Sequence, residues 1–182
     1  MKILITGGAG FIGNTLLRNL LLTTDHEIIN LDKLGYASDL TYINTLDERS
    51  LSRYKFIKVD LNNFLKLKEA IGSSQPDRII HLAAESHVDR SIDNPNLFVQ
   101  SNVVGTFNLL EVVRDLYQNL SDTRKQNFLF HHISTDEVFG SLGKNGKFSE
   151  QTSYDPRSPY SASKAASDHF VRAWFHTYKI PT

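Results

Sequence analysis

Short apolar runs alternate with longer amphipathic segments along the whole chain. Each run is bounded by polar or turn-forming residues, and the runs lie at Ile3–Ile5, Ile28–Leu31, Phe56–Val59, Ile79–Leu82 and Phe128–Ile133. Apolar runs of this length are typical of parallel strands that are buried on both faces. Because parallel neighbours need crossover connections, the pattern predicts an α/β fold with a doubly wound, Rossmann-like parallel sheet.

Between the runs, apolar residues recur at helical spacing. The predicted helices lie around Leu16–Leu21, around Phe64–Ile71, from about Asn96 to Leu120, and from Pro159 to about Tyr178. Pro159 suits a first helical position, because its missing N–H would have no partner there anyway. In the long helix we expect one apolar stripe to face the core, formed by Val99, Val103, Phe107, Leu110 and Val113. The Gly- and Ser-rich segment Gly140–Pro156 is expected to be a loop.

Composition narrows the possible functions. The 20 basic residues balance the 20 acidic ones, so no overall field favours nucleic acid or an acidic membrane, and we expect neither as a partner. The chain has no Cys, which excludes disulfides and thiolate zinc sites and fits a cytoplasmic location. The first apolar run is too short for a signal segment or a membrane span.

A glycine-rich turn follows the first predicted strand and opens the first predicted helix. Its spacing is Gly7-x-x-Gly10-x-x-Gly13. Glycines at this point allow a dinucleotide pyrophosphate to approach the backbone and the helix N-terminus closely. A Gly-rich turn without a ligand is the alternative.

Two acidic residues follow the next strands. Asp32 ends the second predicted strand, 19 residues beyond Gly13, where a carboxylate can accept a hydrogen bond from the adenosine ribose 2′-hydroxyl and would repel a 2′-phosphate. This favours NAD over NADP, although Lys33 is adjacent. Asp60 follows the third strand and is a weaker candidate for the adenine amino group. A solvated strand-end acid is the alternative for each.

Tyr160 and Lys164 lie four residues apart, on one face of the last predicted helix. We expect the ammonium to lower the pKa of the phenol and make it a base near neutral pH. The pair alone is a weak signal. The glycine turn and the upstream Ser134 strengthen it.

Ser134, Thr135, Asp136 and Glu137 directly follow the last predicted strand. Ligands of open α/β sheets bind at the carboxyl ends of strands, so these side chains should face the cleft. Two adjacent carboxylates there are expected to act as one acid and one base, which suits the elimination of water. An acid pair at a helix N-terminus is the alternative.

Five motifs together resemble the dTDP-glucose 4,6-dehydratase family of extended short-chain dehydrogenases. They are Ile5–Gly13, Asp32–Leu34, His81–Ser91, Ser134–Val138 and Tyr160–Lys164. The resemblance covers essentially the whole chain. It implies a cycle with NAD as cofactor: oxidation of the sugar at carbon 4, loss of water across carbons 5 and 6, and hydride return to carbon 6. The substrate would be dTDP-glucose or a related sugar nucleotide, and the product a 4-keto-6-deoxy sugar nucleotide.

The resemblance also implies residue roles. Tyr160 would take the proton of the 4-hydroxyl, with Lys164 holding the nicotinamide ribose. Glu137 would remove the proton on carbon 5 and Asp136 would protonate the departing 6-hydroxyl. Thr135 and Ser86 would contact the substrate. The implied cofactor contacts are the turn residues Gly7, Gly10, Phe11, Ile12 and Gly13, then Asp32, Lys33, Leu34, Gly35, Asp60, Leu61, Leu82, Ala83, Ala84, Glu85, Ser86, Ser101, Tyr160 and Lys164, with Ser101 standing where the family more often has Thr.

The resemblance also sets expectations for the assembly. The family continues beyond Thr182 with a substrate-binding region, so we expect residues 1–182 to form an incomplete NAD-binding domain with an exposed apolar edge at its last strand. A homodimer through the 96–120 and 159–178 helices is implied. Alternatives are another UDP- or GDP-sugar dehydratase, epimerase or decarboxylase, or an NAD-binding remnant without turnover. No metal is expected, because His131 and His132 should point to opposite faces of a strand.

Overall fold

The computed structural model describes residues 1–182 and contains one parallel five-stranded sheet. The strands are β1 (Lys2–Thr6), β2 (Glu27–Asp32), β3 (Tyr54–Lys58), β4 (Arg78–His81) and β5 (Leu129–His132). Their order in the sheet is β3-β2-β1-β4-β5, and every neighbouring pair is parallel. All five predicted strands and the doubly wound fold class are confirmed.

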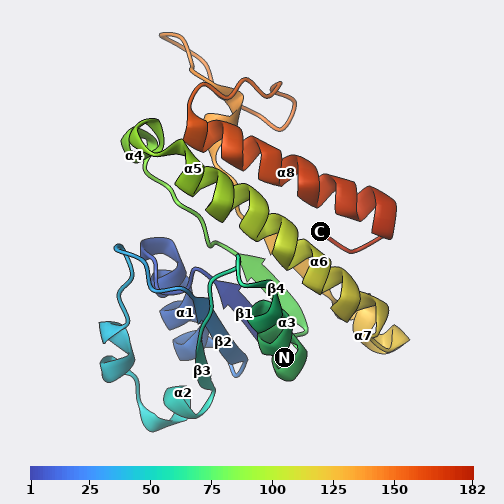
Figure 1. The fold of residues 1–182 in the computed structure, drawn as a ribbon. Coiled ribbons are helices and arrows are strands. Elements are labelled where there is room, and N and C mark those ends of the chain that lie inside the picture. Colours follow the sequence, from blue (N-terminus) through green and yellow to red (C-terminus); the bar gives the residue numbers. More distant parts are fainter.

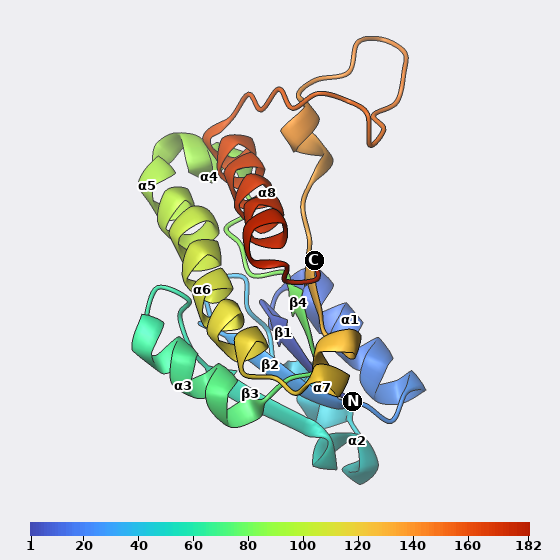
Figure 2. The same cartoon turned by 90° about the vertical axis from the view of Figure 1, so that its right-hand side faces the viewer.

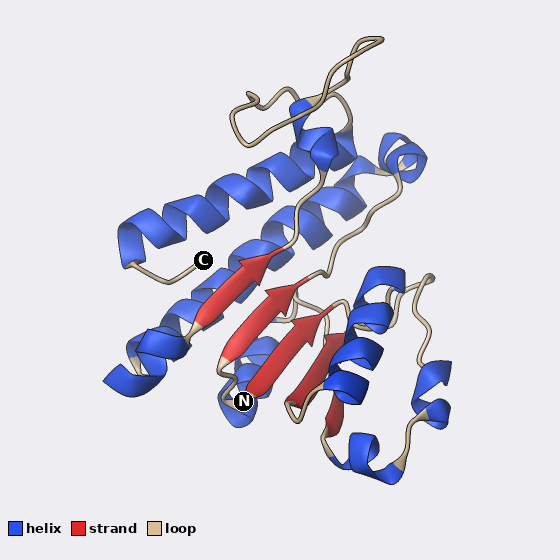
Figure 3. Cartoon of the chain, turned by 180° about the vertical axis from the view of Figure 1, so that it is seen from behind, coloured by secondary structure: helices blue, strands red, loops and turns tan.

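Helices cover both faces of this sheet. On one face lie α3 (Phe64–Ser74), α6 (Gly105–Gln118) and α8 (Pro159–Tyr178), with α6 and α8 side by side (Figures 1 and 2). The opposite face carries α1 (Phe11–Thr23), which lies over the strands when the sheet is viewed from behind (Figure 3). The strand order reverses between β1 and β4, so a crevice forms where their carboxyl ends diverge.

The core has two parts because side chains alternate along each strand. On β1, Leu4 packs into the larger cluster beneath α3, α6 and α8, whereas Ile3 and Ile5 pack with Leu17 of α1. Apolar residues on both faces explain why the strand runs are uninterrupted in sequence.

The last helix begins as its sequence predicts. Pro159 takes the first helical position, and Ser158 is the N-cap, accepting from the Ser161 backbone N–H in a reciprocal capping box. The helix ends at Tyr178 and is followed by Lys179 in the left-handed conformation. The predicted span 159–178 is confirmed.

The predicted long helix has an internal irregularity. It consists of α5 (Pro95–Phe98), a π-helical segment η2 (Val99–Val104) and α6. The extra residue per turn in η2 rotates the helix faces, and the predicted stripe is only partly correct: two of its five residues are buried and Val103 is partly buried. Leu110 and Val113 are buried, but Val99 and Phe107 are 45% and 38% exposed.

Five short elements were not predicted. They are η1 (Thr41–Thr45), α2 (Glu48–Ser52), α4 (Val88–Asp93), α7 (Asp122–Asn127) and η3 (Asp136–Phe139). Each is too short to show an apolar period in sequence. Gly140–Pro156 contains neither helix nor strand, as predicted.

The last residues of the chain lie against β5. Phe130 donates its backbone N–H to the Pro181 carbonyl at 2.9 Å, and Ile180 is fully buried in the larger core cluster. The expectation of an exposed apolar edge is therefore wrong at Phe130. No helix of the protein combines the length and apolarity needed to cross a membrane.

Candidate functional site

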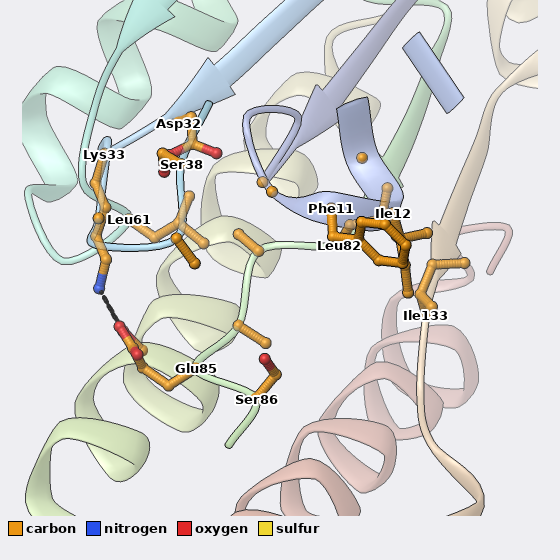
Figure 4. A pocket seen from close by; sticks show the side chains of 18 of the residues that line it. Phe11, Ile12, Asp32, Lys33, Ser38, Leu61, Leu82, Glu85, Ser86 and Ile133 are labelled. Atoms are coloured by element: carbon orange, nitrogen blue, oxygen red, sulfur yellow. Dashed lines mark hydrogen bonds and ion pairs between the residues drawn. The ribbon is translucent and has the colours of Figure 1, made fainter. Parts of the chain in front are cut away.

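A cavity of about 520 Å³ occupies the crevice at the carboxyl ends of the strands (Figure 4). Its volume lies within the range of small-ligand and cofactor pockets. Of the residues expected to contact the cofactor, all except Leu34 line it. Eight further residues line the cavity without having been assigned to the cofactor: Leu31, Tyr36, Ala37, Ser38, Val59, His87, Ile133 and Ser134. The first six lie within three residues of an assigned one along the chain, whereas Ile133 and Ser134 directly follow β5.

The glycine turn brings backbone to backbone at the bottom of the cavity. Gly7 has a φ of +72°, and a Cβ there would lie 2.6 Å from the Ala83 backbone nitrogen. A Cβ on Gly13 would collide with the Gly7 carbonyl oxygen. Helix α1 then starts with no acidic residue in its first turn and no side-chain cap. Its first N–H groups and the positive end of the helix dipole are thus available to an anion.

Two large apolar side chains lie directly after this turn, at the first two positions of α1. Phe11 is 90% exposed and Ile12 is 63% exposed, and both line the cavity. Side chains of this size are normally covered. Their exposure beside an anion-binding helix start fits a ligand that is part phosphate and part flat ring.

Asp32 is buried at the end of β2, and donors from three nearby residues hold its carboxylate in place. Its carboxylate accepts from the backbone N–H of Ala9 at 3.0 Å and of Leu34 at 2.8 Å, and from the Ser38 hydroxyl at 3.3 Å. Leu34 has a φ of 60°, so the chain turns sharply after the strand. These contacts fix the carboxylate at the cavity wall.

Lys33 and Glu85 form an ion pair across the cavity. The Lys33 Nζ lies 2.9 Å from Glu85 Oε1 and 3.0 Å from the Ser101 hydroxyl. Figure 4 shows the Lys33 side chain extending away from Asp32 toward Glu85. The residues after β2 and β4 are therefore linked by a charged contact.

The segment after β4 is held by Asn102 from the π-helical part of the long helix. The Asn102 amide accepts from the Glu85 backbone N–H at 2.8 Å and donates to the Glu85 carbonyl at 3.0 Å and to the Ser163 hydroxyl at 2.9 Å. The backbone carbonyl of Asn102 accepts a hydrogen bond from the Ser167 hydroxyl at 2.6 Å. One buried amide thus joins the β4 loop to α8. Sequence reasoning missed Asn102, and the buried polar residue within an apolar helix was the only available signal.

Tyr160 and Lys164 are both buried on α8 and line the cavity. The Lys164 Nζ donates to the Ile133 carbonyl at 2.7 Å, and burial lowers its pKa to about 8. Burial raises the pKa of the Tyr160 phenol; Glu137, Asp136 and Asp168 raise it further, and the Thr135 hydroxyl lowers it. The expected lowering of the phenol pKa is wrong, because burial and the three carboxylates raise it.

Thr135, Asp136 and Glu137 form a turn beside the cavity rather than part of its wall. The Thr135 hydroxyl caps η3 by accepting from the Glu137 backbone N–H at 3.3 Å. None of the three residues lines the cavity, although Ser134 and Tyr160 do. Both carboxylates are nevertheless close enough to raise the pKa of Tyr160.

A buried carboxylate that sequence reasoning did not single out lies behind this turn. Asp168 on α8 accepts from the Ser134 hydroxyl at 2.5 Å, from the Tyr154 hydroxyl at 2.9 Å and from His132 Nε2 at 3.0 Å. These hydrogen bonds lower the pKa of Asp168, outweighing its burial. Its position four residues after Lys164 was the available sequence signal, because it places both side chains on one helix face.

Arg90 and His87 lie at the rim with Tyr36. The Arg90 guanidinium stacks 3.6 Å above the Tyr36 ring, and the His87 and Tyr36 ring centroids are 5.9 Å apart. These contacts order the loops after β2 and β4, and only Tyr36 and His87 line the cavity. Arg90 thus contributes to the order of these loops without lining the cavity.

Comparison with known proteins gives consistent matches. The family model described as GDP-mannose 4,6 dehydratase matches residues 4–182. The dTDP-glucose 4,6-dehydratase of Escherichia coli is 50% identical over 191 residues, covering 100% of this chain and 52% of the relative. The crystal structure of dTDP-glucose 4,6-dehydratase from Bacillus anthracis in complex with NAD is 37% identical, with a TM-score of 0.83, and covers 100% of this chain and 52% of that one.

A second structural relative has another activity. The UDP-glucose 4-epimerase of Thermus thermophilus, solved in complex with NAD, is 28% identical with a TM-score of 0.82, and the match covers 99% of this chain and 52% of that one. The chain thus spans about half the length of the curated relatives it matches.

Proposed function

Because the chain belongs to the GDP-mannose 4,6 dehydratase family, we propose that it forms the NAD-binding and proton-transferring half of a dTDP-glucose 4,6-dehydratase. In this proposal, residues 1–182 are one Rossmann-like domain. The observation that carries the proposal is that the cavity is bordered by the Tyr160–Lys164 pair and flanked by the Asp136–Glu137 turn. The identity of 50% to a dTDP-glucose 4,6-dehydratase supports the substrate.

The residues around the cavity fit NAD. The pyrophosphate would lie on the first turn of α1, over Gly10 and Gly13, and Phe11 and Ile12 would cover the cofactor. Asp32 would accept from the adenosine ribose, and Asp60 with Leu61 would border the adenine. When bound, oxidised NAD supplies a hydride acceptor and a positively charged ring beside Tyr160.

Tyr160 would take the proton from the 4-hydroxyl of the sugar. Its raised pKa keeps the phenol protonated by itself, so it needs a nearby positive charge to act as a base. The positively charged ring of oxidised NAD would supply that charge, and the Lys164 Nζ would hold the nicotinamide ribose while remaining bonded to the Ile133 carbonyl.

Asp136 and Glu137 would carry out the elimination. Once carbon 4 is a ketone, the proton on carbon 5 is acidic enough to be removed by a carboxylate base. Glu137 would remove it, and Asp136 would protonate the 6-hydroxyl as it leaves as water. Thr135 and Ser86 would hold the sugar, from the β5 turn and the β4 loop respectively.

The proposal includes the assembly and the location of the protein. The outer faces of the long helix and α8 expose Val99, Phe107, Phe175 and Tyr178, which would be covered in a homodimer formed by the 96–120 and 159–178 helices. A chain without cysteine fits a cytoplasmic location.

The direct test is product formation from dTDP-glucose and NAD. The protein carrying this sequence, with any further residues that its gene encodes, should form the 4-keto-6-deoxy sugar nucleotide. Glu137→Gln should abolish the product while leaving NAD binding intact, whereas Arg49→Gln, far out on the surface, should change neither. Epimerised dTDP-galactose as the product would favour the epimerase alternative, and NAD binding without any product would favour a remnant.

A further inference from the structure

The Lys33–Glu85 ion pair has a position that bears on which dinucleotide the cavity accepts. We propose that Glu85 is a specificity-determining residue: by binding the Lys33 ammonium, it withholds from the adenosine end of the cavity the cation that a 2′-phosphate would need. The inference rests on the proposed function, because it specifies which dinucleotide the same site selects.

Lys33 is the natural partner for a 2′-phosphate. It follows Asp32 directly, and in dinucleotide-binding folds a basic residue near this acid is what accommodates the extra phosphate. The cavity wall contains one other Lys or Arg, Lys164, which lies on α8 and is bonded to the Ile133 carbonyl at 2.7 Å. Lys33 is therefore the one Lys or Arg that lines the cavity at its adenosine end.

Glu85 holds this cation firmly. Its side chain is only 9% exposed, against 34% for Lys33, so the anion is the fixed partner and the lysine the adaptable one. The backbone of Glu85 is fixed in turn by both hydrogen bonds to the buried Asn102 amide. The Ser101 hydroxyl, at 3.0 Å, gives the ammonium a second acceptor on the same side.

The direction of the Lys33 side chain matters as much as its charge. Its stem extends away from the Asp32 carboxylate toward Glu85 of the β4 loop (Figure 4). Lysine carries its charge on a flexible four-carbon stem, so the ammonium can be redirected once its partner is removed. Neutralising Glu85 would therefore release a cation next to the ribose and remove an anion from the cavity.

Asp32 alone accounts for only part of the discrimination. Its carboxylate already accepts from Ala9, Leu34 and Ser38, which spreads its charge over three donors. Repulsion of a phosphate by a carboxylate with three donors is weaker than by a free one, because each hydrogen bond stabilises the negative charge. The second device, sequestration of Lys33, adds selectivity that Asp32 does not supply.

The test compares the binding of NAD⁺ and NADP⁺ to four forms of this chain by isothermal titration calorimetry. They are the wild type, Glu85→Gln, Lys33→Met and the double variant. We expect Glu85→Gln to tighten NADP⁺ binding at least tenfold relative to NAD⁺, and the double variant to lose that gain. Lys33→Met alone should weaken the binding of NADP⁺ and NAD⁺ to the same extent within about twofold, because the ion pair already withholds the lysine and the unpaired Glu85 then opposes both dinucleotides.

The outcomes separate this inference from the proposed function. If the wild type binds NAD⁺ but Glu85→Gln gains no NADP⁺ affinity, or gains it equally in the double variant, the specificity role of Glu85 is refuted while the NAD site stands. If Glu85→Gln does not fold, Lys33→Met decides: a loss of NADP⁺ affinity at least tenfold larger than the loss of NAD⁺ affinity would show that Lys33 is not withheld. A folded wild type that binds neither dinucleotide overturns the proposed function, and this inference with it.

Discussion

The Asp168 carboxylate accepts a hydrogen bond from the Ser134 hydroxyl at 2.5 Å, which ties α8 to the turn carrying Asp136 and Glu137. One helical turn earlier, Lys164 donates to the carbonyl of Ile133. His132, the last residue of β5, also contacts Asp168. Helix α8 is therefore bonded to three consecutive residues, His132, Ile133 and Ser134. Tyr160 is on the same helix, so its placement relative to the two carboxylates is set by these contacts.

Replacing Asp168 with Asn should destabilise the fold by roughly 1–3 kcal/mol at pH 7, because three donors lose a charged acceptor. The folded-state pKa of Asp168 is lowered from 3.8, so its contribution is fully present above pH 3.8 and is lost as pH falls through the folded-state pKa. Urea unfolding at several pH values measures this. Asp25→Asn, a surface control paired only with Arg49, should change stability by less than about 0.5 kcal/mol. An equal effect of the two substitutions would contradict the role given to Asp168.

Lys164→Met should stabilise the fold at pH 7, in contrast to the replacement of Asp168 with Asn. Burial lowers the pKa of Lys164 from 10.5 to about 8. Between these pH values the unfolded chain binds a proton that the folded chain does not, so wild-type stability rises with pH there, and the penalty is complete below about pH 8. At pH 7 the variant should be more stable by on the order of 2 kcal/mol, allowing for the lost bond to Ile133.

This gain in stability of Lys164→Met should shrink as pH rises toward 10.5, because the wild-type protein no longer bears the cost of burying a charged lysine. Lys68→Met, at an exposed surface pair with Asp115, serves as the control and should show no such trend. A Lys164→Met variant that is less stable than the wild type at pH 7 and at pH values above 8 would show that the buried ammonium stabilises the fold.

Two glycines should respond to alanine in opposite directions. Gly7→Ala places a Cβ at a φ of +72° and 2.6 Å from the Ala83 backbone, and it should cost at least about 2 kcal/mol and weaken any ligand at the turn. Gly72 lies within α3 with nothing near its Cβ position, and Gly72→Ala should stabilise by roughly 0.5–1 kcal/mol. Thermal and urea unfolding measure both, and tolerance of Gly7→Ala would mean that the turn relaxes easily.

Asn102→Ala should destabilise the protein by roughly 2–4 kcal/mol, because it leaves the backbone N–H and carbonyl of Glu85 without their buried partners. Amide hydrogen exchange should speed up at Glu85 in particular. Asn119→Ala removes one exposed bond to Asp115 and serves as the matched control. Unchanged protection at Glu85 would show that the β4 loop is held by other contacts.

The strands and the main helices could be predicted because their signals are local. Ile3–Ile5 and Ile79–Leu82 are apolar on both faces, and Pro159 marks the first residue of α8 whatever it packs against. The π-helical segment around Asn102 could not be predicted, because Asn102 is held there by residues distant in sequence, Glu85 and Ser163. The glycine turn was predicted from motif spacing, which reports the same local geometry, whereas most of the other cavity residues were expected from the resemblance to the dehydratase family.

The electrostatics of the site depended on the fold. Four-residue spacing correctly placed Tyr160 and Lys164 on one helix face, but it could not reveal that the ammonium is directed to the Ile133 carbonyl. Nor did it indicate that burial raises the phenol pKa. Exposure of Val99 and Phe107 likewise follows from the rotation of the helix at η2, which no periodic pattern records.

Titrating NAD⁺ into the ¹⁵N-labelled protein and following its amide resonances tests whether this chain binds NAD in the crevice between β1 and β4. We expect saturable shifts concentrated at Gly7, at Gly10–Gly13 and at Leu82–Ser86, which line the two sides of the crevice. Asp32→Asn should weaken this binding about tenfold or more. NAD binding in this crevice would be contradicted if the amide resonances of the folded protein did not shift at millimolar NAD⁺. Shifts confined to residues on the facing sides of α3 and α6 would contradict it as well.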